Sequence, residues 1–364
     1  MKFKYYIVLL ALIAVVSCQK KLIVKDAPDF SVSIVDSVTT FKAGTPVSFD
    51  IQGSADIISF YSGEIFHDYA FKDGRLVNVS GKGLTLSFKS GIAKLTPPGT
   101  QTDQFSILVS TDFTGDYSDL AKVKAATWTD ITDSFTLGNS PTLAASNTAD
   151  LSSYVVPGKP IYFALKYITR PQATNGLANQ WLIESFTLNS KDTLSNGAAI
   201  NIADQIHTGF RIVDENPVNA PARSQVTTTR VTLYGNVYKQ ASDPIFDPNN
   251  PIFDPENPIY NPDSAAYVAG AVPPKFVAFD PASPYNDPQS ENWAVSAPIS
   301  VDTVNLGSDW AVAVRSSIYT AKPTEYKYTY KLPGTYKAYF VASNNTIDES
   351  SGQVIKEIDI TITP

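Results

Sequence analysis

The sequence predicts an all-β protein built from sandwich-type sheets, and three observations point to this class. Apolar and polar residues alternate with a period of two in many short segments, such as Phe30–Ile34 and Leu84–Phe88. This alternation, with many β-branched and aromatic residues, is typical of strands that bury one face. Gly, Pro and Asn separate the segments and favour turns. No long amphipathic helix is evident, and only Asp119–Ala126 predicts one or two helical turns. Sandwiches or jelly rolls are therefore the expected class.

Length and composition narrow the class of protein further. The chain has 364 residues, of which 43% are apolar and 17% charged, and its net charge is −7. That length suits two or three domains, and the low charge content excludes a disordered solvating chain. The negative charge argues against a nucleic-acid binder. One Cys and two His offer little material for a disulfide or a zinc site.

The first residues predict a lipoprotein signal peptide over residues 1–17. A basic start precedes the apolar run Ile7–Val16, which is too short to span a bilayer as a helix. The run ends in Val-Val-Ser-Cys18, which resembles a bacterial lipobox. The resemblance implies cleavage before Cys18 and acylation of its sulfur and new amino group, for example by palmitate. A buried Cys in a core helix is the alternative. Residues 18–29 would then form a lipidated linker, and the lipid is the expected attachment to the membrane.

A proline-rich repeat interrupts the β pattern. Units that begin at Pro244, Pro251 and Pro258 share the form Pro-Ile-aromatic-Asp/Asn-Pro. Pro cannot donate to a strand ladder and disfavours helix in the preceding residue. We expect a chain of Asx or type I turns whose Ile and aromatic residues pack on a neighbouring surface. The excursion is assigned to residues 243–288, and calcium binding by its acidic residues is the alternative to a purely structural role.

The two ends of the chain resemble two halves of one domain. Gly44–Phe49 has the form G-x-x-V-x-F, and Phe60–Glu64 is an aromatic strand that enters a Gly-acidic turn. Both resemble the first half of a PKD-like, immunoglobulin-type β-sandwich. The second half of that family, Y-x-Y-x-x-x-G-x-Y, appears only at Tyr328–Tyr336. We therefore expect one sandwich from residues 30–75 and 305–364, interrupted by an inserted domain. Two separate small sandwiches are the alternative.

The inserted segment, residues 76–304, resembles jelly-roll modules of the MAM and choice-of-anchor type. The resemblance rests on the apolar strand and polar loop of Ser106–Tyr117, on Trp128-Thr-Asp-Ile, and on the strand Gln180–Phe186. It implies a jelly-roll β-sandwich. Glu184 stands where these modules usually carry Asp.

Taken together, the layout resembles the Bacteroidetes lipoproteins of the domain-of-unknown-function 5017 family. The lipobox, Phe60–Glu64, Leu108–Tyr117, the Asp-Pro repeats and Pro284–Trp293 carry this resemblance. The family has no established activity, and its relatives tend to sit beside outer-membrane glycan-uptake systems. The resemblance therefore implies an outer-membrane lipoprotein and suggests a glycan ligand. Whether it faces the periplasm or the cell surface stays open.

Aromatic residues are the candidates for ligand binding, because sugars stack on aromatic faces. We assign this role to Tyr117, Trp128 and Trp310, and the polar neighbours of Trp310 indicate exposure. Core packing is the alternative for each Trp, since Trp buries a large area. The expected function is non-catalytic binding of a glycan or another surface ligand. An adaptor that binds another outer-membrane protein is the alternative.

The loop Thr111–Tyr117 is a candidate ion site. Asp112 and Asp116 lie four residues apart, and Gly115 between them lets the backbone turn. Glu184 from a neighbouring strand would complete the oxygen shell of a Ca²⁺ ion. The alternative is that both Asp side chains accept hydrogen bonds from turn amides.

A hydrolase is the least expected reading. Glu64, His67 and Asp68 are close in sequence and would suit acid–base chemistry or glycoside hydrolysis. The chain has no G-x-S-x-G elbow, H-E-x-x-H motif or phosphate-binding Gly loop. We therefore assign no catalytic residue.

Overall fold

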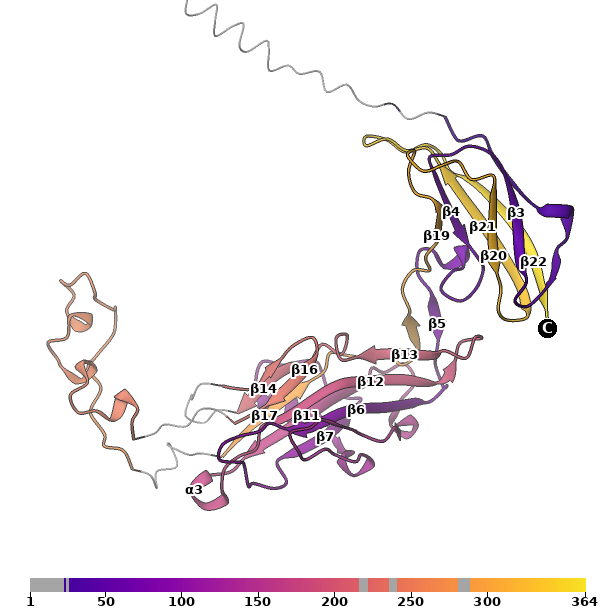
Figure 1. Cartoon of the computed structure of the whole chain (residues 1–364). Coiled ribbons are helices and arrows are strands. Elements are labelled where there is room, and N and C mark those ends of the chain that lie inside the picture. Colours follow the sequence, from indigo (N-terminus) through magenta and orange to yellow (C-terminus); the bar gives the residue numbers. More distant parts are fainter. Residues whose placement is uncertain (1–22, 24–25, 216–221, 236–240, 281–288) are drawn as a thin grey trace, which may run out of the picture. The chain divides into compact units, whose positions relative to one another are not determined.

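The computed structural model describes residues 23, 26–215, 222–235, 241–280 and 289–364. Cys18 and the end of the proline-rich excursion, residues 281–288, lie outside the described residues. The chain divides into two compact units (Figure 1). Unit 1 comprises the described residues up to Leu76 together with Asn305–Pro364, and unit 2 comprises Val77–Val304.

Unit 1 consists of two sheets around one core. The first sheet has the order β1 (Phe30–Ile34), β3 (Pro46–Gly53), β20 (Glu325–Thr329). The second has the order β19 (Val312–Arg315), β4 (Ile57–Tyr61), β21 (Gly334–Ser343), β22 (Val354–Thr363), β2 (Thr40–Lys42). Short 3₁₀ turns occupy η1 (Val35–Ser37) and η2 (Tyr69–Phe71). The core is aromatic: the rings of Phe49, Phe60 and Phe340 lie 4.8–5.6 Å apart.

Both sheets contain strands from the two ends of the chain. β20 pairs with β3, which places Tyr328 opposite Val47. β21 pairs with β4, which places Phe340 opposite Phe60. The first and last segments therefore build a single core, as the split sequence motif predicts. Between β4 and β19 the chain leaves unit 1 and returns along β5 (Leu76–Asn78) and β18 (Thr303–Asn305), which form a two-stranded sheet.

Unit 2 is also a sandwich-like arrangement of two sheets. One has the order β10 (Ala149–Asp150), β6 (Leu84–Ile92), β12 (Trp181–Thr193), β16 (Arg230–Leu233), β15 (Gln225–Val226), with β9 (Ala144–Ala145) on β6 and β13 (Ala199–Asp204) on β12. The other has the order β14 (Arg211–Glu215), β17 (Ser290–Val295), β11 (Tyr162–Thr169), β7 (Phe105–Ser110), β8 (Thr129–Asp130). Helical turns are α2 (Leu120–Lys124), α3 (Gln172–Asn175), η3 (Thr132–Ser134) and η4 (Ser152–Tyr154).

Two hydrophobic clusters stabilise unit 2. The larger contains residues from both sheets, among them Phe88, Phe163 and Phe186. The smaller contains Leu120 and Val123 of α2 and Trp293 of β17. Side chains alternate across a strand, so Trp293 and its neighbour Ala294 point to opposite faces of the second sheet. Ala294 belongs to the larger cluster, so α2 covers the outer face of that sheet.

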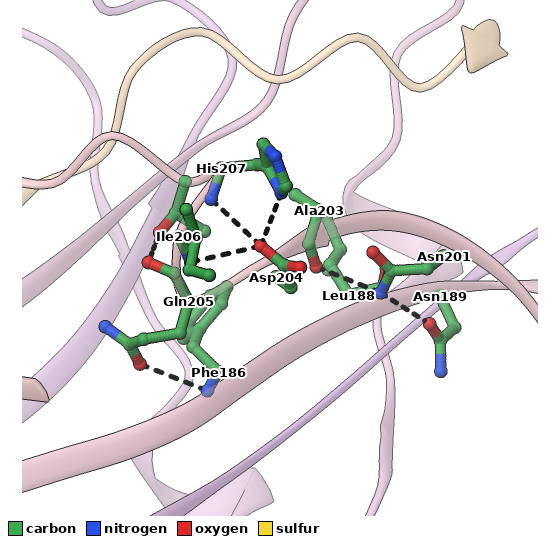
Figure 2. Close-up of polar contacts among 10 residues, drawn as sticks. Phe186, Leu188, Asn189, Asn201, Ala203, Asp204, Gln205, Ile206 and His207 are labelled. Atoms are coloured by element: carbon green, nitrogen blue, oxygen red, sulfur yellow. Dashed lines mark hydrogen bonds and ion pairs between the residues drawn. The ribbon is translucent and has the colours of Figure 1, made fainter. Parts of the chain in front are cut away.

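The long strand β12 is irregular, and a side chain from the turn after β13 supplies a hydrogen-bond partner at the irregularity (Figure 2). Ser185 has a φ of 55°, and the Phe186 amide donates to Oε1 of Gln205 at 3.1 Å. The turn that follows β13 is closed by Asp204, whose Oδ1 accepts the His207 amide at 2.9 Å and contacts Nδ1 of His207 at 2.7 Å. Partial burial opposes ionisation of Asp204, but the bonds from His207 prevail and lower its pKa.

The proline-rich repeat forms three successive 3₁₀ turns, η5 (Pro244–Phe246), η6 (Pro251–Phe253) and η7 (Pro258–Tyr260). Oδ1 of Asn250 accepts the Ile252 amide at 3.0 Å, and its side-chain amide donates to the Pro244 carbonyl at 2.7 Å. Asn257 makes the same two bonds one unit later. The aromatic rings pack on the returning chain: Phe246 contacts Phe279 and Phe253 contacts Phe276. The second and third turns of the repeat are therefore Asx-capped, as the sequence predicts.

Alkaline pH should destabilise unit 1 through its buried tyrosines. Burial and the hydrogen bond to Glu64 raise the pKa of Tyr328 to about 12, and burial raises that of Tyr330. Since an unfolded phenol titrates near 10.0, the neutral Tyr328 stabilises the fold below pH ~10, and this contribution is lost as the pH rises through the folded pKa. We expect the denaturant midpoint of unit 1 to decrease as the pH rises from about 10 to about 12. Tyr328→Phe should make this decrease of the midpoint smaller. A Tyr328 hydroxyl that ionises near pH 10 in the folded protein would contradict the prediction.

Candidate functional site

Trp310 is the exposed tryptophan of the chain. Its side chain is 56% exposed, whereas Trp293 is buried and both Trp128 and Trp181 are partly buried. Trp310 lies in the loop between β18 and β19. Its ring stacks almost parallel on Phe66 at 5.9 Å and 8°, and it meets the edge of His67 at 4.9 Å. We call these three residues, Phe66, His67 and Trp310, the aromatic ledge.

Backbone hydrogen bonds fix the ledge. The Trp310 amide donates to the Phe66 carbonyl at 3.0 Å, and Nδ1 of His67 lies 2.9 Å from the Trp310 carbonyl. Phe66 has a φ of 68°, a conformation that bulky residues rarely adopt. Such a conformation persists only where the surroundings enforce it, and it is often found at functional sites. The preceding turn needs Gly63, because a Cβ there would lie 2.6 Å from the Lys337 carbonyl.

A buried ion pair supports the ledge from behind. Asp309 precedes Trp310 and accepts bonds from Nε of Arg75 at 2.9 Å and Nη2 at 2.5 Å. The second oxygen also accepts the Asp68 amide at 2.9 Å. Arg75 in turn stacks on Phe71, with its guanidinium carbon 3.8 Å from the ring centroid. The two loops of the ledge are thus joined by charge-assisted bonds that water does not reach.

Unit 1 contains a second group of aromatic residues, formed by Tyr61, Tyr69 and Tyr339. Tyr69 stacks on Tyr339 at 4.9 Å and meets Tyr61 edge-on at 5.3 Å. All three rings are partly exposed. The Lys72 ammonium lies 5.6 Å from the Tyr69 ring centroid. Unit 1 therefore presents more than one aromatic ring on which a planar or pyranose face can rest.

Glu64, His67 and Asp68 do not converge on a common point. Glu64 accepts bonds from the hydroxyls of Ser62 and Tyr328. His67 contacts the Trp310 carbonyl, and Oδ1 of Asp68 accepts the Ala70 amide at 2.9 Å, which caps η2. Each side chain is used to hold the loop in shape.

The predicted ion ligands are not brought together either. Oδ1 of Asp112 accepts the Ser110 hydroxyl at 2.8 Å and the Thr127 amide at 2.9 Å, whereas Asp116 accepts the Ser118 amide at 3.0 Å. These bonds lower the pKa of both carboxyls. Glu184 forms an ion pair with Arg230 at 2.5 Å. In the part of the chain that the structure describes, no three His, Cys, Asp or Glu side chains are placed to hold a metal ion. The expected oxygen shell is therefore not assembled, and the turn-amide alternative describes both Asp residues.

Asp112 instead lines an open groove of about 300 Å³ on unit 2. The groove is formed by Val109, Ser110, Thr111, Asp112, Thr127, Thr129, Tyr154 and Lys159. Lys159 also lines a second groove of about 240 Å³, to which Asp302 contributes as well. Hydroxyl groups, a carboxylate and an ammonium group make this a polar surface suited to a hydroxylated ligand.

Tyr117 and Trp128 belong to the smaller cluster of unit 2 rather than to a ligand surface. The Tyr117 hydroxyl donates to the Ser296 carbonyl at 2.7 Å, and its ring lies 4.8 Å below the Arg211 guanidinium. Nε1 of Trp128 donates to the Val123 carbonyl at 2.8 Å, and its ring meets Trp293 edge-on at 5.8 Å. Both rings are partly buried and their polar atoms are satisfied within the fold.

The sequence indicates that Trp310 is exposed, but it gives no sign of its stacking partner Phe66, nor of Tyr154 and Lys159 of the groove. Phe66 carries no sequence signal for a left-handed conformation, because that conformation usually belongs to Gly or Asn. Lys159 follows Pro157-Gly158, a turn signal that places a side chain at the surface without saying what lies beside it.

A family model described as a domain of unknown function, DUF5017, matches residues 17–210. No curated protein and no solved structure matches the chain. Among the described residues, no helix is long and apolar enough to cross a membrane.

Proposed function

The chain belongs to the domain-of-unknown-function 5017 family, and we propose that it is a non-catalytic, lipid-anchored protein of the bacterial outer membrane that binds a glycan or another surface ligand. The observation that carries the binding function is the aromatic ledge, on which an exposed Trp is fixed by backbone bonds. The lipobox at Cys18 supports the anchoring.

The ledge has the physical properties that a sugar platform needs. The face of an aromatic ring attracts the polarised C–H groups of a pyranose. The same face is weakly hydrated, so covering it costs little desolvation free energy. Trp310 is already held by Phe66, His67 and Asp309, so binding orders few additional side-chain torsions. Low ordering cost is a main source of affinity in small polar interfaces. The neighbouring Tyr69 and Tyr339 offer a second stacking position.

The test is a glycan array on the lipid-free chain from residue 19, followed by titration of each hit. Trp310 is the exposed indole, so a stacked sugar should change the intrinsic fluorescence. We expect Trp310→Ala to weaken binding by about 30-fold or more, which is the loss typical of a hot-spot residue of ~2 kcal/mol. Tyr319→Ala removes another exposed aromatic side chain of unit 1 and should leave the affinity unchanged.

A third variant tests whether the ligand binds in the groove of unit 2 instead of on the aromatic ledge. Thr129→Trp places a bulky ring in the groove of unit 2. Loss of binding in this variant, with full binding by Trp310→Ala, would assign the ligand to the groove and refute the ledge. Release of a shortened sugar during the titration would refute the non-catalytic function.

The adaptor function is the second candidate, and the proline-rich arm favours it. No described residue of the arm, 241–280, is buried, and the arm carries six acidic residues and one Lys. Such an exposed, acidic series of turns suits contact with another protein. Two results together would support this function over glycan binding. The chain would bind no sugar on the array, and deletion of residues 243–264 would abolish co-purification of an outer-membrane protein.

Cys18→Ala should leave an unprocessed or soluble precursor, because the acylated sulfur and the new amino group are both lost. The measurement is membrane fractionation together with the mass of the N-terminal peptide. Two acyl signals normally suffice for stable anchoring. Wild-type protein free in the periplasm, with no acyl mass on that peptide, would disprove the anchor.

A further inference from the structure

Three apolar side chains of unit 1 are far more exposed than their chemistry favours. Tyr319 is 93% exposed, Ile347 is 90% exposed and Ile318 is 58% exposed. We call them the apolar tip. Single exposed apolar residues are common, but a group of large ones at one end of a domain marks a contact with a partner or a membrane.

The loops that carry the apolar tip are held in place by hydrogen bonds. Arg315 is buried, and its guanidinium donates to the carbonyls of Ala55, Ile318 and Thr320, which closes the loop 316–320. The turn that carries Ile347 is closed by the bond from the Thr346 amide to the Glu349 carbonyl at 2.8 Å. The side chains therefore project from ordered turns.

Both loops lie at the end of unit 1 where the described N-terminal segment begins (Figure 1). The Asn344 side chain donates to the Asp26 carbonyl at 2.9 Å and accepts the Asp56 amide at 3.1 Å. Ala55, the neighbour of Asp56, accepts the bond from Arg315. This chain of contacts joins the two loops of the tip to Asp26.

Cys18 is eight residues before Asp26. Eight residues span at most about 29 Å when fully extended, so a lipid on Cys18 keeps Asp26 within that distance of the bilayer. We propose that the apolar tip inserts into the headgroup region of the bilayer that holds Cys18. This inference rests on the anchoring in the proposed function, and it adds a second, non-covalent membrane contact.

The chemistry of the tip favours neutral lipids. The tip side chains are uncharged, and charges of both signs lie near them along the chain, acidic Asp26, Asp56 and Asp348 and basic Lys25 and Lys322, so no net attraction to anionic headgroups is expected from the tip. Tyr and Ile suit the interface because one has an amphipathic ring and the other an apolar branch. Binding should therefore depend weakly on salt.

The inferred contact also sets the direction of the aromatic ledge. Ile57, at the start of β4, pairs with Ser343 beside the tip, whereas Tyr61, at its end, pairs with Tyr339. The loop of the ledge begins just after Tyr61. A tip held in the bilayer would therefore direct the ledge away from the membrane.

The experiment uses the single cysteine of the chain. In the mature protein the Cys18 sulfur is acylated, so an introduced cysteine is the free thiol for an environment-sensitive fluorophore. The probe position is Ile347→Cys. The matched control is Leu332→Cys, in the turn before Gly334, at the opposite end of β21 and 51% exposed.

In phosphatidylcholine vesicles the fluorophore at position 347 should shift to the blue and be quenched by lipid-borne quenchers, while that at position 332 should report water. Equal, water-like spectra at both positions would overturn the proposal. The acyl mass of the N-terminal peptide, measured on the same sample, shows separately whether the anchor itself is present.

A lipid-free measurement keeps the two proposals distinguishable. The chain from residue 19, which retains every described residue, should still sediment weakly with phosphatidylcholine vesicles. Tyr319→Ser with Ile347→Ser should lower its partition coefficient by about 10-fold or more, because most of the apolar area that enters the lipid is removed. Circular dichroism checks that the double variant is folded. A partition coefficient that does not change would refute the tip even if Cys18 is acylated.

Discussion

Deletion of residues 335–364 should abolish the folding of unit 1 and leave unit 2 folded. The deletion removes all but the first residue of β21 and all of β22. β21 is the partner of both β4 and β22, so β4 loses its central neighbour. The core loses Phe340, which contacts Phe49 and Phe60. Truncation of one buried Phe costs about 3–5 kcal/mol, and loss of two strands exceeds the ~5–15 kcal/mol that stabilise a domain.

Limited proteolysis followed by mass spectrometry measures this effect. Residues 30–75 should become rapidly cleaved, whereas residues 77–304 should resist cleavage apart from exposed loops. A matched deletion of residues 243–264 removes only exposed or partly exposed residues of the arm and should leave both units protected. If the N-terminal strands stayed protected in the C-terminal deletion, they would have a separate core, contrary to their pairing with β20 and β21.

Arg75→Ala should destabilise unit 1 by about 3–5 kcal/mol, because it leaves the buried carboxylate of Asp309 without a counter-charge. The effect should extend to the ligand, since Asp309 is adjacent to Trp310 and also holds the Asp68 amide. We therefore expect the variant to lose glycan affinity even under conditions in which it remains folded. Denaturant unfolding and fluorescence titration measure the two effects independently.

The control for this prediction is an ion pair at the surface of the same unit. Lys337 pairs with Glu357, and both side chains are about half exposed. Exposed pairs contribute roughly 0–1 kcal/mol, so Lys337→Ala should change stability by less than that and leave binding intact. Equal losses from Arg75→Ala and Lys337→Ala would show that the buried pair does not support the ledge.

Much of the fold follows from local patterns in the sequence. Alternation predicts strands at Phe30–Ile34 and Leu84–Phe88, and the structure places β1 and most of β6 there. The proline-rich repeat predicts Asx turns, because Pro excludes ladder bonds and Asn accepts amides two residues ahead. These features depend on residues only a few positions apart. The pairing of the chain ends was also predictable, since a known two-part motif is split between them.

The sites depend on residues far apart in the chain, and only the tertiary structure brings them together. Trp310 was identified from its neighbours, but its partner Phe66 and the support from Arg75 come from a loop that follows β4. The sequence predicted Asp112 and Glu184 as ion ligands. In the structure, Asp112 accepts a hydrogen bond from the Thr127 amide, and Glu184 forms an ion pair with the Arg230 guanidinium. Sequence spacing constrains which side chains share a strand face. Which charge neutralises a buried carboxylate, and which ring an exposed Trp stacks on, is settled only when distant loops close against each other in one packed unit.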